Sequence, residues 1–238
     1  ASSEPKAAAD LAALRTKAVG VGDHWVINGQ KIWTTTYWGK YMFLAARTDP
    51  DAKPPHAGIS TFIVSLDTPG ITINPSDTMY GGTFANIFYD NVRVPLDALV
   101  GEVNGGWKVL MNALATERVL VGGGIVMKVA HLFESLCAYI REAEVDGKPL
   151  AHDVLVRDRI GTVAADIEVG RQLMMQCVEL VRDGVTPPEY AAISKVFCSE
   201  LMERLGEMAL VLIGLRATLS QGAPACMKNG KFEQGLRD

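Results

Sequence analysis

The spacing of hydrophobic and polar residues changes near residue 103. Before it, short runs of β-branched and aromatic residues alternate with polar residues and are separated by glycine and proline pairs. A period of two is typical of strands that bury one face, and Gly and Pro mark the turns between them. The pattern predicts strands at residues 58–64 and 70–74, with turns at 22–23, 54–55, 69–70 and 81–82. We therefore predict a small antiparallel β domain over residues 1–102.

After residue 103 the apolar residues recur at helical spacing over three long stretches, residues 107–143, 154–183 and 188–215. A stripe with a period of 3.6 residues predicts a helix that packs one face against a core. Asp-Gly at 146–147 and Thr-Pro-Pro at 186–188 break the pattern between the stretches. Long helices joined by short loops pack side by side in alternating directions, so we predict an antiparallel helical bundle over residues 103–238.

The stretch from Trp25 to Thr36 carries the strongest local signal. Asn28-Gly29 lies between two β-prone runs. It predicts a type I′ hairpin, because both central residues of that turn need positive φ. The second run ends in Trp33 followed by three threonines. An indole followed by several hydroxyls suits the packing of a flat polar group.

Charge and composition narrow the function. The net charge is −4 and no Lys/Arg-rich run is present, which argues against a nucleic-acid partner. The longest apolar runs, such as residues 208–215, are shorter than the roughly 20 residues of a membrane span, so we predict no membrane insertion. The four cysteines and four histidines lack metal-ligand spacing, so we predict no metal site. Widely spaced thiols without pairs indicate a reducing, cytoplasmic location.

Further motifs flank this stretch: Ser2-Ser3-Glu4-Pro5, the run at residues 88–95, and Gly105-Gly106-Trp107. In their order and spacing these motifs resemble the acyl-CoA dehydrogenase family along the whole chain. The resemblance implies an α+β fold, with an antiparallel β-barrel-like domain followed by a C-terminal antiparallel four-helix bundle that builds a tetramer. It also implies an N-terminal helical domain and a last segment that are not among these 238 residues.

The resemblance implies FAD as the cofactor. It places Trp33 and Thr35, with Thr34 between them, beside the isoalloxazine ring, and Ser3 at the pyrimidine end of the ring. An indole packs well on a flat tricycle, and a hydroxyl can donate a hydrogen bond to flavin N5. Without the resemblance, Trp33 would be a core aromatic residue and the threonines would be strand formers. Residues 6–9 depart from the family pattern, because Lys-Ala-Ala-Ala replaces a glycine- and serine-containing loop that suits a phosphate.

The resemblance also implies a catalytic base. Glu117 matches the glutamate that removes the α-proton in one branch of the family, and Arg118 matches the arginine that contacts the CoA portion. Such a carboxylate needs a dry pocket that raises its pKa toward neutrality. Three glycines at 122–124 serve close packing or leave room for a bulky acyl group. The alternative is a solvated Glu-Arg pair on a helix surface.

Part of the family's shared FAD site is missing. The positions of an arginine and a phenylalanine that grip the adenine and pyrophosphate hold Ala143 and Asp146, and a glutamine position holds Val211. Loss of the arginine removes a bidentate phosphate clamp, and an aspartate repels a diphosphate. The pattern is similar to the heteromeric acyl-CoA dehydrogenases of actinobacterial sterol side-chain degradation. It implies a second subunit of the same fold in an α2β2 tetramer, with self-association as the alternative.

These features together predict FAD-dependent α,β-dehydrogenation of an acyl-CoA to a 2-enoyl-CoA. The acyl group would be bulky, such as a steroid side chain, and an electron-transfer flavoprotein would be the redox partner. Three alternatives remain open. The chain is a non-catalytic scaffold subunit of such a complex, a flavin oxidase or monooxygenase of the same fold, or a binding module without flavin.

Overall fold

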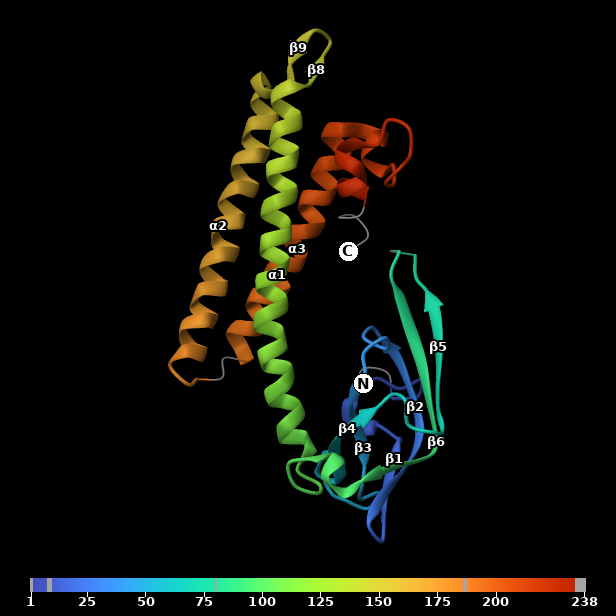
Figure 1. Ribbon diagram of the computed structural model, residues 1–238. Coiled ribbons are helices and arrows are strands. Elements are labelled where there is room, and N and C mark those ends of the chain that lie inside the picture. Colours follow the sequence, from blue (N-terminus) through green and yellow to red (C-terminus); the bar gives the residue numbers. More distant parts are fainter. Residues whose placement is uncertain (1, 8–9, 80, 186–187, 234–238) are drawn as a thin grey trace. The chain divides into compact units, whose positions relative to one another are not determined.

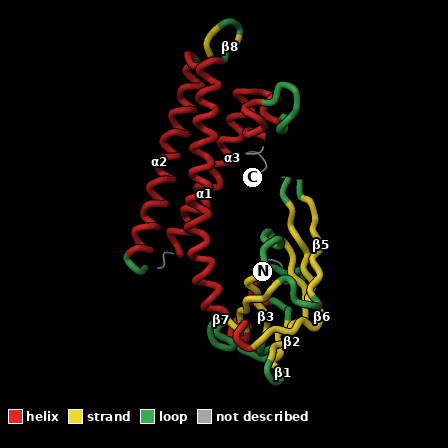
Figure 2. Tube along the Cα trace, in the orientation of Figure 1, coloured by secondary structure: helices red, strands yellow, loops and turns green. Residues whose placement is uncertain are grey.

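A computed structural model describes residues 2–7, 10–79, 81–185 and 188–233 (Figure 1). The chain forms two compact units, Ala1–Ala113 and Leu114–Asp238. The first unit holds the main β-sheet and the second holds the long helices (Figure 2). This arrangement confirms the predicted α+β class.

The first unit is built on one sheet of seven strands in the order β5-β6-β2-β1-β3-β4-β7. The strands are β1 (Lys17–Val21), β2 (His24–Thr34), β3 (Tyr41–Arg47), β4 (Ile59–Ser65), β5 (Ile71–Asp77), β6 (Thr83–Pro95) and β7 (Leu99–Val100). Predictions for residues 58–64 and 70–74 are therefore confirmed as β4 and β5.

The predicted antiparallel, barrel-like arrangement needs a correction. Strand β1 pairs in parallel with β3, through Lys17 and Arg47, so the sheet is mixed. The reason is that β2 is already paired on both edges, with β1 and β6. Strand β3 runs in the direction opposite to β2 and adds to the free edge of β1. Because β1 is also antiparallel to β2, β3 runs parallel to β1. In the described residues β5 and β7 are edge strands that do not pair with each other, so the sheet is not a closed barrel.

The predicted hairpin at Asn28-Gly29 is wrong. Strand β2 runs continuously through both residues, and the turn lies at Gly22-Asp23, where Gly22 has a φ of +60°. Asn28 and Gly29 instead form an irregularity in the pairing with β6. A Cβ atom on Gly29 would lie 2.5 Å from Thr16 Oγ1. The glycine therefore permits close approach of a neighbouring segment rather than a chain reversal.

The start of the first helix is fixed inside the β unit. The backbone N–H of Asn104 donates to Ser60 Oγ (2.7 Å), Ser60 and Thr48 share a hydroxyl contact (2.7 Å), and Thr48 Oγ1 donates to Asn104 Oδ1 (2.6 Å). These bonds close a ring that joins β4, the end of β3 and the segment before the helix. A Cβ atom on Gly106 would lie 2.7 Å from the Ser60 backbone, so only glycine fits there.

The second unit contains three long helices, α1 (Gly106–Glu142), α2 (Val154–Arg182) and α3 (Pro188–Ile213). Their bounds confirm the three predicted helical stretches to within two residues. The short hairpin of β8 (Glu144–Val145) and β9 (Lys148–Pro149) joins α1 to α2, and Asp153 Oδ1 caps α2 by accepting from the N–H groups of Leu155 and Val156 (Figure 1). Short helical segments η5 (Gly214–Thr218) and η6 (Met227–Gly230) follow α3.

The core of the helical unit is apolar and comes from all three helices. Its fully buried centre includes Val129 and Leu136 of α1 and Leu201 and Leu205 of α3. By length and composition alone α1 is apolar enough to cross a membrane, which the run lengths did not lead us to expect. Its most apolar 18-residue window has a mean hydropathy of 1.5, and 44% of that window is buried. A buried core helix passes the same test.

Candidate functional site

Strand β2 ends in a bulge that turns Trp33 outward. Lys31 and Thr34 pair with Ile87 and Ala85 of β6, so β2 holds one more residue than its partner between these pairs. Trp33 has a φ of +56°, which is uncommon for a bulky residue, and its side chain is 66% exposed. The indole meets Phe84 edge to face, with ring centroids 5.8 Å apart. Bulges and left-handed bulky residues of this kind cluster at functional sites.

Of the four predicted ring contacts, the three at the end of β2 differ in their surroundings. Trp33 and Thr35 are exposed, whereas Thr34 is buried. Thr34 Oγ1 has no hydrogen-bond partner within the described part of the chain. A buried hydroxyl left without a partner costs about 1–3 kcal/mol. The end of β2 therefore offers an exposed aromatic face, an exposed hydroxyl and an unsatisfied one.

A buried ion pair lies directly behind this face, and the sequence interpretation missed it. Lys31 Nζ lies 2.7 Å from Glu4 Oε1, and their side chains are 0% and 5% exposed. Glu4 Oε2 also accepts from the N–H of Arg15 (2.6 Å) and Oε1 from the N–H of Thr16 (3.0 Å). The one signal in the sequence was a lysine at an inward position of an otherwise apolar strand face.

Burial and the partners act on the two pKa values in opposite ways. Burial favours a higher pKa for Glu4, but the Lys31 charge and three hydrogen bonds outweigh it and hold the pKa below its usual 4.5. Burial lowers the pKa of Lys31 from 10.5, and the charge of Glu4 offsets only part of this change. Glu4 therefore depends on Lys31 for its ionised state in the protein interior.

Ser3 is brought to the same strand. The Ser3 carbonyl accepts a hydrogen bond from Ile32 N (3.0 Å), and the Ser2 carbonyl accepts one from Lys31 Nζ (3.3 Å). The N-terminal segment thus lies alongside the last residues of β2. Two predicted ring contacts that are thirty positions apart in the sequence, Ser3 and Trp33, are joined through this short segment.

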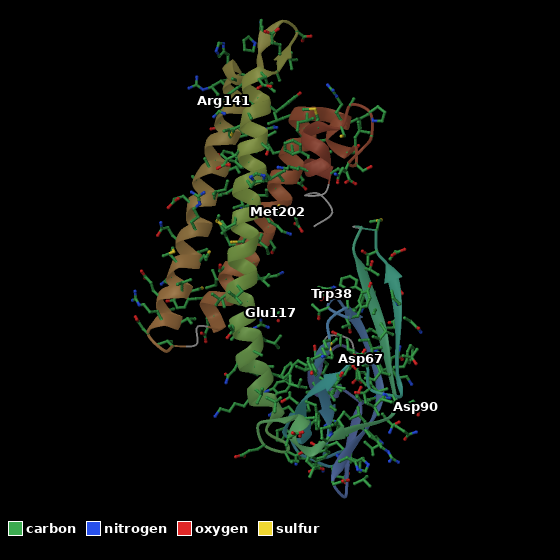
Figure 3. The ribbon with its side chains drawn as sticks, viewed as in Figure 1. Trp38, Asp67, Asp90, Glu117, Arg141 and Met202 are labelled. Atoms are coloured by element: carbon green, nitrogen blue, oxygen red, sulfur yellow. The ribbon has the colours of Figure 1, made fainter. Side chains whose placement is uncertain are left out.

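Glu117 and Arg118 lie on α1, in the helical unit, and both are exposed. Figure 3 shows Glu117 on this helix. Neither side chain has a hydrogen bond or an ion pair among the residues that the structure describes. Within this unit alone the carboxylate faces solvent, so any dry surroundings have to come from outside the unit.

An exposed apolar face continues from Glu117 along α1. We call it the α1 stripe; its members share one side of the helix and are Glu117, Leu120, Val121, Gly124 and Met127. Leu120 and Met127 are 71% and 60% exposed. Large exposed apolar side chains in a row mark a surface that receives an apolar partner or ligand.

The three consecutive glycines in α1, residues 122–124, serve different purposes. A Cβ atom on Gly122 would lie 3.0 Å from Ser194 Oγ of α3, and one on Gly123 would lie 2.8 Å from Met174 Sδ of α2. These two glycines allow close helix packing. A Cβ atom on Gly124 would meet nothing within 4 Å. Gly124 therefore leaves open space in the middle of the α1 stripe.

Comparison with known proteins identifies the family. The model of the acyl-CoA dehydrogenase middle domain matches residues 1–92, and that of the acyl-CoA dehydrogenase C-terminal domain matches residues 104–238. The chain belongs to the acyl-CoA dehydrogenase family. Acyl-CoA dehydrogenase FadE34 of Mycobacterium tuberculosis is 36% identical over 207 residues, which are 86% of this chain and 28% of the relative.

Solved structures of this family have the same fold. The ChsE4-ChsE5 complex of Mycobacterium tuberculosis matches with a TM-score of 0.89 and 33% identity, over 99% of this chain and 61% of the other. The Tcur3481-Tcur3483 steroid ACAD matches with a TM-score of 0.90 and 32% identity, over 99% and 60%. The chain thus spans less than two thirds of the length of each of these proteins.

The residues predicted to replace an FAD clamp have clear local roles. Asp146 and Gly147 have φ values of +53° and +71° and form the turn of the β8–β9 hairpin. Asp-Gly is a preferred pair for such a turn, whereas a phenylalanine would be strained there. Ala143 accepts a hydrogen bond from Leu150 N (2.9 Å) at the base of the hairpin. Val211 is exposed near the end of α3.

Proposed function

We propose that the protein is a subunit of an FAD-dependent acyl-CoA dehydrogenase that converts an acyl-CoA to a 2-enoyl-CoA. The observation that carries the proposal is Glu117 at the head of the α1 stripe. A carboxylate without a structural partner, followed by exposed apolar side chains and an open glycine, suits an acyl chain whose α-carbon lies at the carboxylate.

The end of β2 fits the flavin ring. The indole of Trp33 supplies a flat apolar face, Thr35 supplies an exposed hydroxyl, and the Ser2-Ser3 segment lies beside them. Thr34 Oγ1 is a polar atom that still lacks a partner. FAD, when bound, supplies the acceptor for the β-hydride, and an electron-transfer flavoprotein takes up the electrons.

The chain's own residues have two tasks in this reaction. Glu117 removes the α-proton, so the proton moves from the α-carbon to the carboxylate while the C–H electrons enter the new C=C bond. Arg118 binds the CoA portion and fixes the thioester near Glu117. An acyl group that covers Leu120 and Val121 displaces water from the carboxylate, which favours proton abstraction.

A bulky acyl group is the proposed substrate class. The open space at Gly124 supports it, because a side chain there would project into the α1 stripe. The similarity to a structure described as a steroid ACAD points the same way.

A second subunit of the same fold is the proposed partner, in a cytoplasmic α2β2 complex. The replacements Ala143 and Asp146 support it, since this chain offers neither an arginine nor a phenylalanine at these positions. The likeness to the ChsE4-ChsE5 complex agrees with this proposal. The partner would contribute the missing FAD clamp.

The Glu117→Gln variant of the full-length protein tests the proposal, because glutamine keeps the shape and removes the base. We expect turnover of acyl-CoA to fall by roughly 10²–10⁴-fold while bound flavin stays unchanged. Unchanged turnover would identify the chain as a scaffold subunit. The Lys-Ala-Ala-Ala sequence at residues 6–9 favours that alternative, because it lacks the family's glycines and serine. Oxygen consumption without an added electron acceptor would instead indicate an oxidase.

The flavin-to-protein ratio tests the partner. We expect little flavin on this chain alone and about one FAD for each pair of chains after co-expression with the partner. One FAD on every chain purified alone would contradict the shared site.

A further inference from the structure

We propose that the buried Glu4–Lys31 pair is a positioning device that holds the Ser3 segment and Trp33 in the geometry that binds the flavin ring. This inference rests on the proposed function, since it assigns a role toward the flavin. Both side chains are buried, and neither residue belongs to the predicted ring contacts. Their role would be exerted through their neighbours in the chain, Ser3 on one side and Trp33 on the other.

Three contacts bind the N-terminal segment to the end of β2. Lys31 Nζ bonds to Glu4 Oε1 (2.7 Å) and to the Ser2 carbonyl (3.3 Å), and Ile32 N bonds to the Ser3 carbonyl (3.0 Å). The lysine therefore reaches both sides of Ser3. Without its ammonium group, one backbone hydrogen bond remains between the two segments.

Glu4 is the fixed end of this connection. Its two carboxylate oxygens accept backbone N–H groups of Arg15 and Thr16, independently of Lys31. Thr16 in turn abuts Gly29 of β2, as the close approach at that glycine shows. The Glu4 carboxylate is thus held by the backbone at residues 15–16. The charge-assisted bond from Lys31 then ties this backbone to β2.

The place of Lys31 in β2 explains why the connection bears on Trp33. The bulge begins after Lys31 and ends at Thr34. A one-residue shift in a strand moves each side chain to the opposite face. A lysine locked in the interior therefore decides where the bulge occurs, and hence that Trp33 faces outward.

A purely structural purpose explains the pair poorly. Two charges taken out of water lose solvation, and apolar residues of similar volume often stabilise a core as well or better. What an ion pair adds is direction, because its hydrogen bonds specify one arrangement of the segments that it joins.

The test uses the full-length flavoprotein, purified with its partner subunit, and three variants: Lys31→Met, Glu4→Gln and the double variant. Arg47→Met is the matched control. Arg47 also ties down the N-terminal segment, through the carbonyls of Ala12 (2.6 Å) and Leu14 (3.0 Å), but away from Ser3. For each protein we would measure the dissociation constant for FAD, the visible absorption spectrum of bound flavin and the thermal unfolding temperature.

We expect the single variants to bind FAD roughly tenfold to hundredfold more weakly and to shift the flavin spectrum, as when a group that orients a binding residue is lost. The double variant should recover thermal stability, because no unpaired charge remains, yet keep the weakened FAD binding. Arg47→Met should lose thermal stability and keep the wild-type affinity and spectrum.

The inference is wrong if the double variant binds FAD with wild-type affinity and spectrum. This comparison decides the matter even where the single variants do not fold. Wild-type protein that binds no FAD, with or without its partner, would contradict the proposed function itself and the inference with it. The two failures are therefore distinguishable.

Discussion

The end of β2 and the α1 stripe are built in opposite ways. The end of β2 is specified from behind, by a buried ion pair, a bulge and backbone hydrogen bonds within one unit. The α1 stripe is an exposed helix face on which Glu117 has no partner within its own unit among the described residues. The geometry of the end of β2 is therefore set by the chain itself. The α1 stripe is an open surface that a ligand or another part of the protein has to cover.

Under the proposed function, the difference separates two tasks, which are holding the flavin ring and receiving the acyl group. A ring contact needs a fixed direction, which buried hydrogen bonds supply. An acyl contact needs area and space, which an open helix face supplies without fixed partners. Substitutions behind β2 should therefore act on folding and cofactor together, while substitutions on the α1 stripe should act on substrate choice with little effect on stability.

The largest expected effect concerns the buried pair. Lys31→Met leaves the Glu4 carboxylate buried without its cation, which should lower the free energy of unfolding by about 3–5 kcal/mol. Glu117→Gln, the matched change on the α1 stripe, should alter it by no more than about 0.5 kcal/mol. Chemical denaturation of both variants gives the comparison. Equal losses would show that the two regions do not differ in the way described.

The next effect uses one glycine from each region. Gly29→Ala places a methyl group 2.5 Å from Thr16 Oγ1, so it should destabilise the protein by about 1–3 kcal/mol. Gly124→Ala meets open space in a helix and should stabilise it by up to about 1 kcal/mol. Thermal unfolding of the two variants tests this contrast. A loss of stability in Gly124→Ala would mean that Gly124, like Gly122, is required for packing.

Larger side chains at Gly124 sharpen the same contrast in function. Gly124→Leu should lower kcat/KM for a bulky acyl-CoA about tenfold or more relative to a short straight-chain acyl-CoA. The reason is that space for a single methylene group in an apolar pocket generally changes selectivity by about 10–200-fold. The measurement is the ratio of the two kcat/KM values in variant and wild type. An unchanged ratio would place the acyl group away from the α1 stripe.

Acid should weaken the β2 region only below the usual pKa of 4.5 of a glutamate carboxylate. The folded pKa of Glu4 is held below 4.5, so the stability that its ionised form contributes is fully present above that value. It is lost as the pH falls through the depressed folded pKa. Glu4→Gln should remove this contribution and flatten the acid limb of a plot of unfolding free energy against pH. An identical acid limb in both proteins would assign the loss to other carboxylates.

The smallest effect concerns Thr34. Its hydroxyl is buried without a partner among the described residues, so Thr34→Val should stabilise the flavin-free protein by about 1 kcal/mol. Thr35→Val, at an exposed position, should leave stability unchanged. A destabilised Thr34→Val protein, measured by thermal unfolding without flavin, would show that the hydroxyl is satisfied in the folded chain.

The helices were predicted almost to the residue, and the reason lies in their signals. An apolar period of 3.6 residues extends over many turns, and Asp-Gly or Pro-Pro breaks it sharply. The sheet was harder, because strand order and direction depend on contacts between distant segments. The parallel pairing of β1 with β3 follows from both edges of β2 being occupied, which no local pattern reveals.

Two misinterpretations arose in β2 itself. Asn28-Gly29 is the preferred pair for a tight turn. In the structure, however, Gly29 is needed because Thr16 packs too close to it for any larger residue. The Glu4–Lys31 pair joins residues 27 positions apart, and neither residue type suggests burial. In both cases a contact between distant parts of the chain determines the structure, and the local sequence pattern does not. Both contacts lie in β2, which carries part of the candidate site.

The ring of hydrogen bonds through Asn104, Ser60 and Thr48 has a consequence for exchanging parts between relatives. The compact units divide at residues 113–114, near the start of α1, but the helix is seated in the β unit by this ring and by Gly106. A chimera spliced at residues 113–114 would take the first part of α1 from one parent and the rest of the helix from the other. A splice at residues 101–103 keeps α1 whole, provided that the parent of the β unit has Thr48 and Ser60 and the parent of the helices has Asn104 and Gly106. The segment to exchange between relatives ends at residues 101–103. It is therefore shorter than the compact β unit, which ends at Ala113.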